Sequence, residues 1–173
     1  MKLKLAELFI GVFFLALISC NSQAQKSINK SEGKSSTIEK VVKDEKVWKE
    51  ELTEMEYYVL REKGTERSFT GDLWDNKKEG IYTCAGCELP LFHSDTKYKS
   101  GTGWPSFWQP LKEEHIAEDV DFKIGYKRVE VLCSRCDGHL GHVFPDGPEP
   151  TGLRYCINSV SLNFEEHTEA TEK

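Results

Sequence analysis

Cys156 has the neighbours of a reactive thiol, with Arg154 two residues before it and Asn158 two residues after it. Apolar and polar residues alternate from 160 to 164, which is typical of a half-buried strand. Extending that strand backwards puts Arg154, Cys156 and Asn158 on one face. A nearby guanidinium favours the nucleophilic thiolate, and a carboxamide can hold an oxygen atom beside it. The run predicts a catalytic cysteine, and the alternative is a buried structural cysteine.

Four of the other five cysteines form two Cys-x-x-Cys pairs, Cys84 with Cys87 and Cys133 with Cys136, and a predicted strand leads into each pair. Pairs at this spacing favour a single zinc ion bound by four thiolates. The 45 residues between the pairs predict a small domain inserted between the two arms of the site. The alternatives are two disulfides, which an exported protein could form, and a thioredoxin-like redox pair. No βαβ pattern surrounds either pair, so the redox interpretation is weaker.

Two glycine-rich stretches carry the remaining candidates. The first, residues 100–108, predicts an ordered loop that presents Trp104 as a flat apolar wall. The second, residues 138–147, contains His139 and His142, and its glycines predict a loop rather than a helix that binds metal. In a loop beside Cys156, an imidazole would act as a proton donor and as a partner of the thiolate. The alternative is a pair of structural histidines.

The N-terminal segment has the features of an export signal. Lys2 and Lys4 precede an apolar run at 8–18 that is too short to span a bilayer comfortably. The run ends in Leu-Ile-Ser-Cys at 17–20, which resembles the lipobox of bacterial lipoproteins. That resemblance implies that Cys20 becomes the lipidated N-terminus of the mature protein. The alternatives are an ordinary cleaved signal and an uncleaved anchor.

The 173 residues predict one domain with appendages. The segments are a signal peptide at 1–19, a flexible polar linker with the lipidated Cys20 at 20–47, a folded domain at 48–165 and a disordered tail at 166–173. The formal charge of −6 argues against a nucleic-acid partner, because binding phosphates needs a basic face. We expect an exported monomer in the bacterial cell envelope, attached to a membrane through its lipid anchor.

From about residue 48 to residue 165 the chain closely resembles the B-type peptide methionine sulfoxide reductases, which are selective for the R epimer. Six motifs in order carry the resemblance: residues 64–66, 69–71, both Cys-x-x-Cys pairs, 103–107, 138–147 and 154–159. The family implies a mainly all-β fold of two antiparallel sheets of the β-tent type, with a few short peripheral helices. It also implies a structural zinc held by the two cysteine pairs, away from the active face.

The resemblance assigns a role to each residue near the reacting sulfur. Cys156 is the nucleophile that attacks the sulfoxide and is left as a sulfenic acid when methionine leaves. His139, His142 and Asn158 surround the sulfoxide oxygen, and Arg154 tunes the thiolate. A hydrogen-bonded or protonated oxygen makes the sulfoxide a better electrophile, so these donors must face the nucleophile.

Trp104, together with Phe144, receives the S-methyl group of the substrate in this resemblance. The chain departs from many relatives at Thr102, where they carry a cysteine that attacks the sulfenic acid to form an internal disulfide. A threonine cannot do this, so we expect an external thioredoxin-like thiol to reduce Cys156 directly. The expected substrates are oxidised proteins that carry methionine-R-sulfoxide.

Two other functional classes share part of this pattern. A non-catalytic zinc-knuckle binding module would keep the four paired cysteines without needing Cys156, both histidines and Asn158 together. A general thiol–disulfide oxidoreductase would need a redox-active Cys-x-x-Cys pair.

Overall fold

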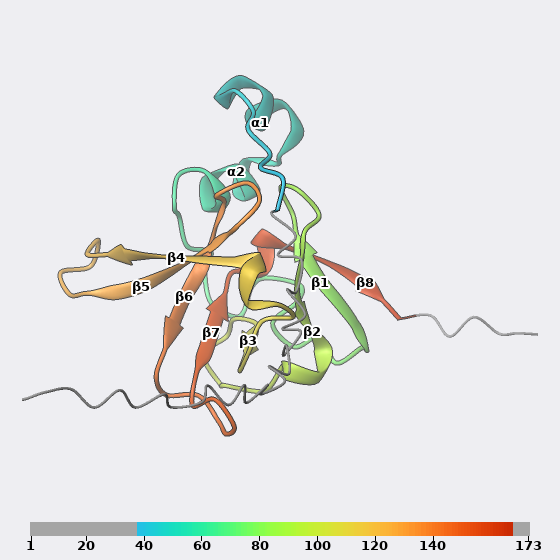
Figure 1. Ribbon diagram of the computed structural model, residues 1–173, viewed down its shortest axis with the longest axis vertical. Helices are drawn as coiled ribbons and strands as arrows, with labels where there is room; N and C mark the ends of the chain where they lie inside the picture. The colour runs from blue at the N-terminus through green and yellow to red at the C-terminus, as the bar shows by residue number, and fades with distance from the viewer. Residues whose placement is uncertain (1–37, 168–173) are drawn as a thin grey trace, which may run out of the picture. The chain divides into compact units, whose positions relative to one another are not determined.

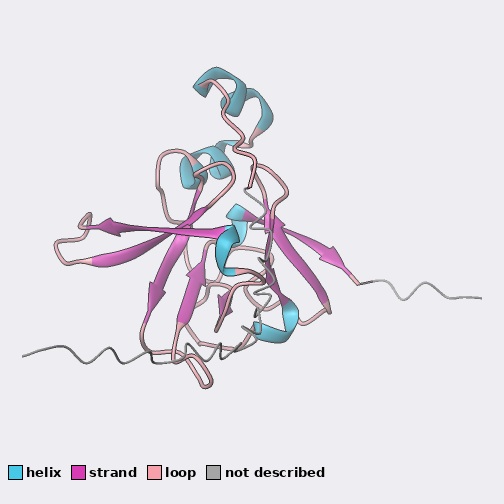
Figure 2. Cartoon of the chain, viewed as in Figure 1, coloured by secondary structure: helices cyan, strands magenta, loops and turns pink. Residues whose placement is uncertain are grey.

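Short antiparallel strands dominate the computed structural model, which describes residues 38–167 (Figure 2). The strands are β1 Gly80–Cys84, β2 Pro90–His93, β3 Ser106–Phe107, β4 Ile116–Asp121, β5 Arg128–Cys133, β6 His139–Phe144, β7 Arg154–Ile157 and β8 Leu162–Glu166. The helices are α1 Glu45–Glu51 and α2 Glu54–Leu60, with 3-10 turns η1 Ser94–Thr96, η2 Glu113–His115 and η3 Ser159–Ser161. No helix within these residues has the length and apolar character that crossing a bilayer requires.

The strands form two antiparallel sheets, one with the order β2-β1-β8 and one with the order β3-β7-β6-β5-β4 (Figure 1). Aromatic side chains join the sheets, because Phe107 of β3 stacks on Phe92 of β2 with ring centroids 4.4 Å apart. Tyr82 of β1 contacts the same Phe107 ring edge-on at 5.0 Å. The predicted fold, mainly β with two antiparallel sheets and short helices, is confirmed.

The register of the five-stranded sheet brings the candidate catalytic residues together. Cys156 of β7 is paired with His142 of β6 on one side and with Ser106 of β3 on the other. Strand alternation buries Tyr155 on the opposite face, towards the core. The approach of β6 to β7 requires glycine at 141, because a Cβ atom there would lie 2.0 Å from the carbonyl oxygen of Cys156.

The predicted continuous strand from 154 to 164 is wrong. The run forms two strands, β7 and β8, which belong to different sheets and are joined by the turn η3. The buried Glu66 carboxylate causes the break, since it accepts hydrogen bonds from the backbone N–H groups of Ser159 and Val160. Those two N–H groups are therefore lost to a sheet ladder.

The predicted loop at 138–147 is also wrong over most of its length, because residues 139–144 form the central strand β6. Gly141, the glycine within this strand, is suited to the close backbone contact with β7 rather than to a loop. A strand places His142 more rigidly beside Cys156 than a loop would.

Residues 38–47, within the stretch predicted to be linker, pack against the domain. Ile38 and Val41 pack against the core, and the Val41 N–H donates to the Arg135 carbonyl at 2.8 Å. Helix α1 begins at Glu45 and buries Trp48. At the other end, β8 continues to Glu166, one residue into the predicted tail. The predicted signal peptide and Cys20 lie outside the described residues.

Candidate active site and metal centre

Cys156 lines a cavity of about 110 Å³ that contains most of the predicted site residues. Trp104 and Phe144 provide aromatic surface in this cavity, and His142 and Asn158 provide polar groups. Thr65, Arg128 and Gly141 complete the lining, and sequence analysis had not assigned a role to any of the three. The cavity therefore combines a thiol, an imidazole, a carboxamide and apolar walls, which could receive a small group with one polar atom.

His142 is oriented by a carboxylate. Its Nε2 atom lies 2.8 Å from Oδ2 of Asp121, the last residue of β4. Asp121 also accepts hydrogen bonds from the Lys123 backbone N–H, at 2.6 Å, and from the guanidinium of Arg128. These partners, the Lys123 N–H first, hold the pKa of Asp121 well below its usual range. An ionised Asp121 can only accept, so Nε2 of His142 carries a proton in either charge state of the ring.

Burial lowers the pKa of His142, and the hydrogen bond with Asp121 opposes this effect. His139 lies in an adjoining cavity of about 330 Å³, which His142 also lines. The Nδ1 atom of His139 lies 2.7 Å from the buried carboxylate of Glu130, which also pairs with Lys63 at 2.7 Å. Its Nε2 atom is buried and has no hydrogen-bond partner within the described residues.

Glu66 connects two sides of the cavity, although as a member of the 64–66 motif it had no predicted role. Its backbone N–H donates to Oδ1 of Asn158 at 3.0 Å, and its carbonyl accepts from the Trp104 indole at 3.2 Å. The Nδ2 group of Asn158 donates one bond to the Leu140 carbonyl, at 2.9 Å. Trp104 and Asn158 are therefore fixed in orientation before a ligand arrives.

Arg154 is not among the residues that line the cavity. Its guanidinium makes two bonds of 2.9 Å to the carboxylate of Asp146 and lies 4.4 Å from the centroid of the Phe144 ring. Much of its charge is therefore neutralised by Asp146. The cation that lines the cavity with Cys156 is Arg128 instead.

Burial raises the pKa of the Cys156 thiol, although the hydrogen bond with Thr102 and the charge of Arg154 both lower it. The expected effect of Arg154 is present, but desolvation outweighs it. The Oγ1 atom of Thr102 lies 3.9 Å from the Cys156 sulfur. Thr102, which stands where the family resemblance implies a second cysteine, is therefore in contact with the candidate nucleophile.

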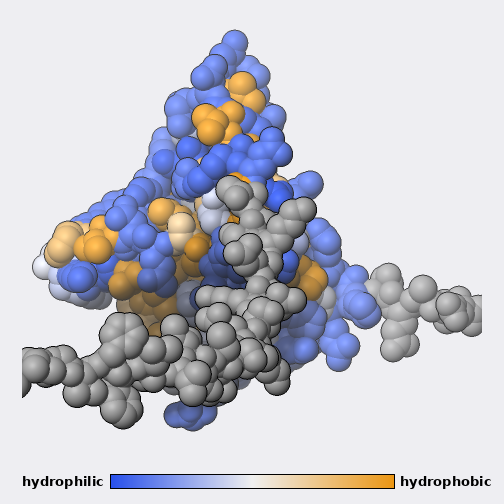
Figure 3. Space-filling view, in the orientation of Figure 1, coloured by the Kyte–Doolittle hydropathy of each residue, from blue (hydrophilic) through white to orange (hydrophobic). Residues whose placement is uncertain are grey.

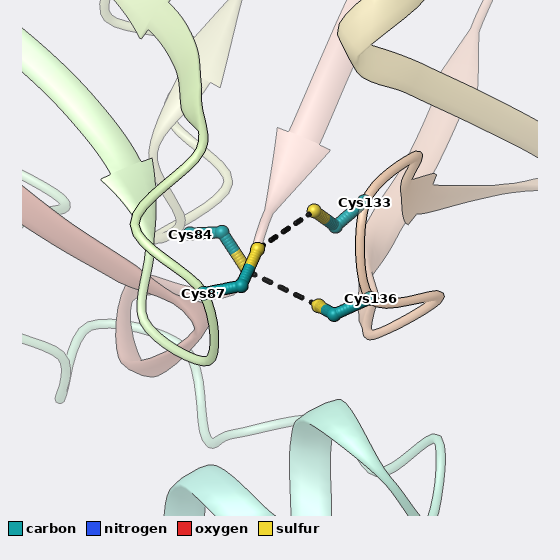
Figure 4. Close-up of side chains that lie close together, drawn as sticks. All are labelled: Cys84, Cys87, Cys133 and Cys136. Carbon is teal, nitrogen blue, oxygen red and sulfur yellow. Dashed lines mark hydrogen bonds between the residues drawn. The ribbon is translucent and has the colours of Figure 1, made fainter. Parts of the chain in front are cut away.

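The two Cys-x-x-Cys pairs converge from the ends of β1 and β5 (Figure 4). The sulfurs of Cys84 and Cys136 are 3.7 Å apart, those of Cys87 and Cys133 are 3.5 Å apart, and all four lie within 4.8 Å of one another. Zinc–sulfur bonds of about 2.3 Å in a tetrahedron place the sulfurs about 3.8 Å apart. All five described cysteines are free thiols, so the four-thiol cluster fits one zinc ion.

Comparison with known proteins identifies the family. Residues 52–166 match the family model of the SelR domain, which covers more than half of the chain. The chain belongs to the SelR-domain family. Its relatives include the "Peptide methionine sulfoxide reductase MsrB" proteins of three organisms. Identity is 54% over 127 residues for Hahella chejuensis, covering 73% of this chain and 91% of the relative. It is 59% over 125 residues for Methanosarcina mazei (72% and 89%) and 58% over 125 residues for Leptospira interrogans (72% and 95%).

The resemblance drawn from six sequence motifs is thus confirmed for the SelR domain. Within it, the structure brings Cys156, His142, Asn158, Trp104 and Phe144 into one cavity, with His139 beside it and Arg154 outside it. Sequence analysis missed Asp121 and Arg128, which lie in the β4–β5 hairpin and carry no motif of their own. Only the pairing of β4 with β5, which sets Asp121 opposite Arg128, could have revealed them.

Proposed function

We propose that this SelR-domain protein reduces methionine-R-sulfoxide in oxidised proteins to methionine, using an external thiol as reductant. The observation that carries the proposal is the pairing of Cys156 with His142 across β6 and β7, in a cavity walled by Trp104 and Phe144. Relatives that carry the reductase name are 54–59% identical to the chain over about nine-tenths of their length. The four-thiol cluster contributes none of the residues of this cavity.

The Cys156 thiolate attacks the sulfoxide sulfur while the sulfoxide oxygen is protonated. The oxygen ends on Cys156, so that a thiol and a sulfoxide give a sulfenic acid and a thioether. Cys156 is oxidised by two electrons and the substrate sulfur is reduced by two. Two external thiols then return Cys156 to the thiol and form a disulfide and water.

His142 supplies the proton in this scheme. Because Asp121 holds the proton on Nε2, the ring must take up a second proton at Nδ1 before it can act as an acid. A positioned proton donor of this kind is typically worth about 100-fold to 10,000-fold in rate. Asn158 assists with the second hydrogen of Nδ2, because the first is committed to the Leu140 carbonyl.

Epimer selection follows from the fixed walls of the cavity. The Trp104 indole is held by the Glu66 carbonyl, and Phe144 by the stacked guanidinium of Arg154. Only one configuration at sulfur places the methyl group against these rings and, at the same time, the oxygen towards His142 and Asn158. The other configuration would place the oxygen on the apolar wall, where it would lose its hydrogen bonds.

A bound zinc would crosslink the β1–β2 and β5–β6 turns through Cys84, Cys87, Cys133 and Cys136, and its role would be structural. Four thiolates leave no open position for a substrate or water. Engagement of these cysteines in the metal site, together with their absence from the cavity, disfavours the thiol–disulfide oxidoreductase and leaves Cys156 without an internal partner. The reductant would then be an external thioredoxin-like protein.

The leader supports a location in the bacterial cell envelope. A lipid on Cys20 would hold the protein at a membrane, while the polar linker would let the domain reach oxidised envelope proteins. Cytosolic thioredoxin could not reach such an enzyme, so its reductant would also belong to the envelope. This placement rests on the lipobox resemblance.

Steady-state kinetics on separate R and S epimers test the function. Cys156→Ser is expected to abolish reduction of the R epimer without lowering the melting temperature. His142→Ala is expected to lower kcat more than it raises KM, because the proton matters most in the transition state. Activity in the serine variant, or equal rates on both epimers, would refute the proposal.

A further inference from the structure

Three hydroxyl groups form a chain that ends at the sulfur of Cys156. Thr102 Oγ1 lies 3.9 Å from that sulfur and 2.8 Å from Ser100 Oγ. Ser100 Oγ in turn lies 2.7 Å from Ser106 Oγ, which donates to the Trp104 carbonyl at 3.2 Å. Ser106 is fully buried, and it is also the β3 residue paired with Cys156. Loop 100–106 therefore connects a backbone carbonyl to the candidate nucleophile through side chains alone.

The direction of this chain follows from counting hydrogens, since each hydroxyl has one to donate. Ser106 spends its hydrogen on the Trp104 carbonyl and must accept from Ser100. Ser100 then has none left for Thr102, so Thr102 donates to Ser100. Thr102 is left with a lone pair facing the sulfur, which suits a protonated Cys156 thiol. With the thiol present, every hydrogen of the chain has an acceptor.

A Cys156 thiolate needs the opposite direction. Thr102 must donate to the sulfur, Ser100 to Thr102, and Ser106 to Ser100, which leaves the Trp104 carbonyl without its bond. We propose that the Thr102–Ser100–Ser106 chain reverses direction when Cys156 ionises, so that Thr102 is a catalytic hydrogen-bond donor to the nucleophile. Ser100 is then a positioning residue. Ser106, through its bond to the Trp104 carbonyl, favours the direction that suits the Cys156 thiol over the thiolate.

The chain supplies a hydrogen bond to the sulfur and does not carry away the proton of the Cys156 thiol. It ends at a carbonyl, which is not a base at neutral pH, and the Ser106 side chain is closed to solvent. The proton of the thiol therefore leaves to the cavity side. The reversed chain also suits the product, since Thr102 can donate to a sulfenate or accept from a sulfenic acid.

Other ionisable groups also face Cys156 and set the background for its titration. Arg154 and Asp146 act on the sulfur from β7 and from the segment after β6. His142 and Arg128 line the cavity with it, and the Tyr98 hydroxyl interacts with its charge from the segment before the loop. Substitutions within the hydroxyl chain leave all five in place, so a change in the Cys156 pKa reports on the chain.

The proposal rests on Cys156 being the nucleophile, but its test needs no sulfoxide. The full chain with zinc bound would be alkylated with iodoacetamide over a range of pH, and the rate at Cys156 followed by mass spectrometry. Trypsin cleaves after Arg154, and peptide 155–173 contains no other cysteine. The pKa of Cys156 is read from the pH dependence of that rate.

Thr102→Val keeps the shape of the side chain and removes the donor, and is expected to raise the pKa of Cys156 by about one unit. Thr102→Ser is expected to titrate like the wild type. Ser106→Ala is expected to lower the pKa, because ionisation would no longer cost the bond to the Trp104 carbonyl. Thr70→Val, which removes a hydroxyl that donates to the nearby Arg67 carbonyl, is the matched control and should leave the pKa unchanged.

The opposite signs of the two substitutions separate a directional chain from simple loosening of the loop. The proposal would be overturned if the pKa of Cys156 in Thr102→Val equalled that of the wild type. It would also be overturned if Thr102→Val and Ser106→Ala shifted this pKa in the same direction. If Thr102→Val fails to bind zinc and fold, the pKa of Cys156 in Ser106→Ala is the deciding measurement. A lowered pKa then supports the chain, and an unchanged or raised pKa overturns it. Loss of reductase activity in Cys156→Ser is a separate result that bears on the function and not on the chain.

Discussion

Asp121 is expected to control the acid that protonates the sulfoxide oxygen, although strands β5 and β6 lie between its own strand β4 and the strand of Cys156. Its carboxylate is 2.8 Å from Nε2 of His142 and raises the pKa of the imidazole against the effect of burial. Replacing it with asparagine removes the negative charge but keeps an oxygen in place. The pKa of His142 should then fall further, by about one unit for a charged partner at hydrogen-bond distance.

The sign of the effect on rate follows from the role of the protonated ring. At a pH above the pKa of His142, each unit of lowering reduces the imidazolium fraction about tenfold. Reduction of the R epimer at neutral pH should therefore be about tenfold slower in Asp121→Asn. Below both pKa values the ring is protonated in either protein, so the two rates should converge as pH falls.

The assay is kcat as a function of pH, measured with a methionine-R-sulfoxide peptide and saturating thiol. Asp119→Asn is the matched control, because Asp119 lies on the same strand two residues earlier and is exposed. It carries the same charge change without a contact to His142 and should keep the wild-type profile. Superimposable profiles for Asp121→Asn and the wild type would refute the assignment of His142 as an acid tuned by Asp121.

Three further predictions follow from the cysteines and from the leader. Cys84→Ser should lower zinc content and melting temperature together, whereas purified active protein without metal would contradict the zinc site. Thr102→Cys should form an internal disulfide with Cys156 after one equivalent of substrate, because the 3.9 Å contact leaves only a small movement to close. Wild-type protein should form none, and a bond to a zinc cysteine would show a misassigned thiol. Fatty-acid labelling should require Cys20, and unlabelled wild-type protein that retains Met1 would exclude lipidation.

The fold of two antiparallel sheets was predicted from the family resemblance, and individual strands were predicted from local sequence. The strands leading into both Cys-x-x-Cys pairs were predicted because they alternate before a recognisable knuckle. Strand β6 was missed, since its glycines suggest a loop when considered alone. The role of Gly141, which allows β6 to approach the backbone of Cys156, depends on how β6 pairs with β7. The break between β7 and β8 was missed for the same reason, because it depends on the distant Glu66.

Most residues that line the cavity with Cys156 could be predicted, because their types and order match a family. The groups that orient them could not, since an aspartate in a hairpin such as Asp121 has no distinctive neighbours in sequence. The exposed surface of the β4–β5 hairpin is a second feature that the sequence did not predict. Figure 3 shows apolar surface near the end of the β4–β5 hairpin, where Phe122, Ile124 and Tyr126 are exposed. Local composition would have assigned those side chains to the core.

Arg154 and burial act on the pKa of Cys156 in opposite directions. A guanidinium two residues away does lower the pKa, yet the cost of burying the thiolate depends on the whole cavity and is larger. The bidentate pair with Asp146 further reduces the charge that reaches the sulfur. Spacing along a strand shows which groups share a face, whereas three-dimensional packing decides which contribution is largest.

A single-turnover experiment tests the central claim most directly. The zinc-bound protein would be mixed, without reductant, with one equivalent of methionine-R-sulfoxide or methionine-S-sulfoxide, and both products would be analysed. The R epimer should yield one methionine per chain, and peptide 155–173 should gain the mass of one oxygen atom that a dione reagent traps as a sulfenic acid. The S epimer should yield neither. Methionine formed without oxidation of Cys156, or formed equally from both epimers, would contradict the account.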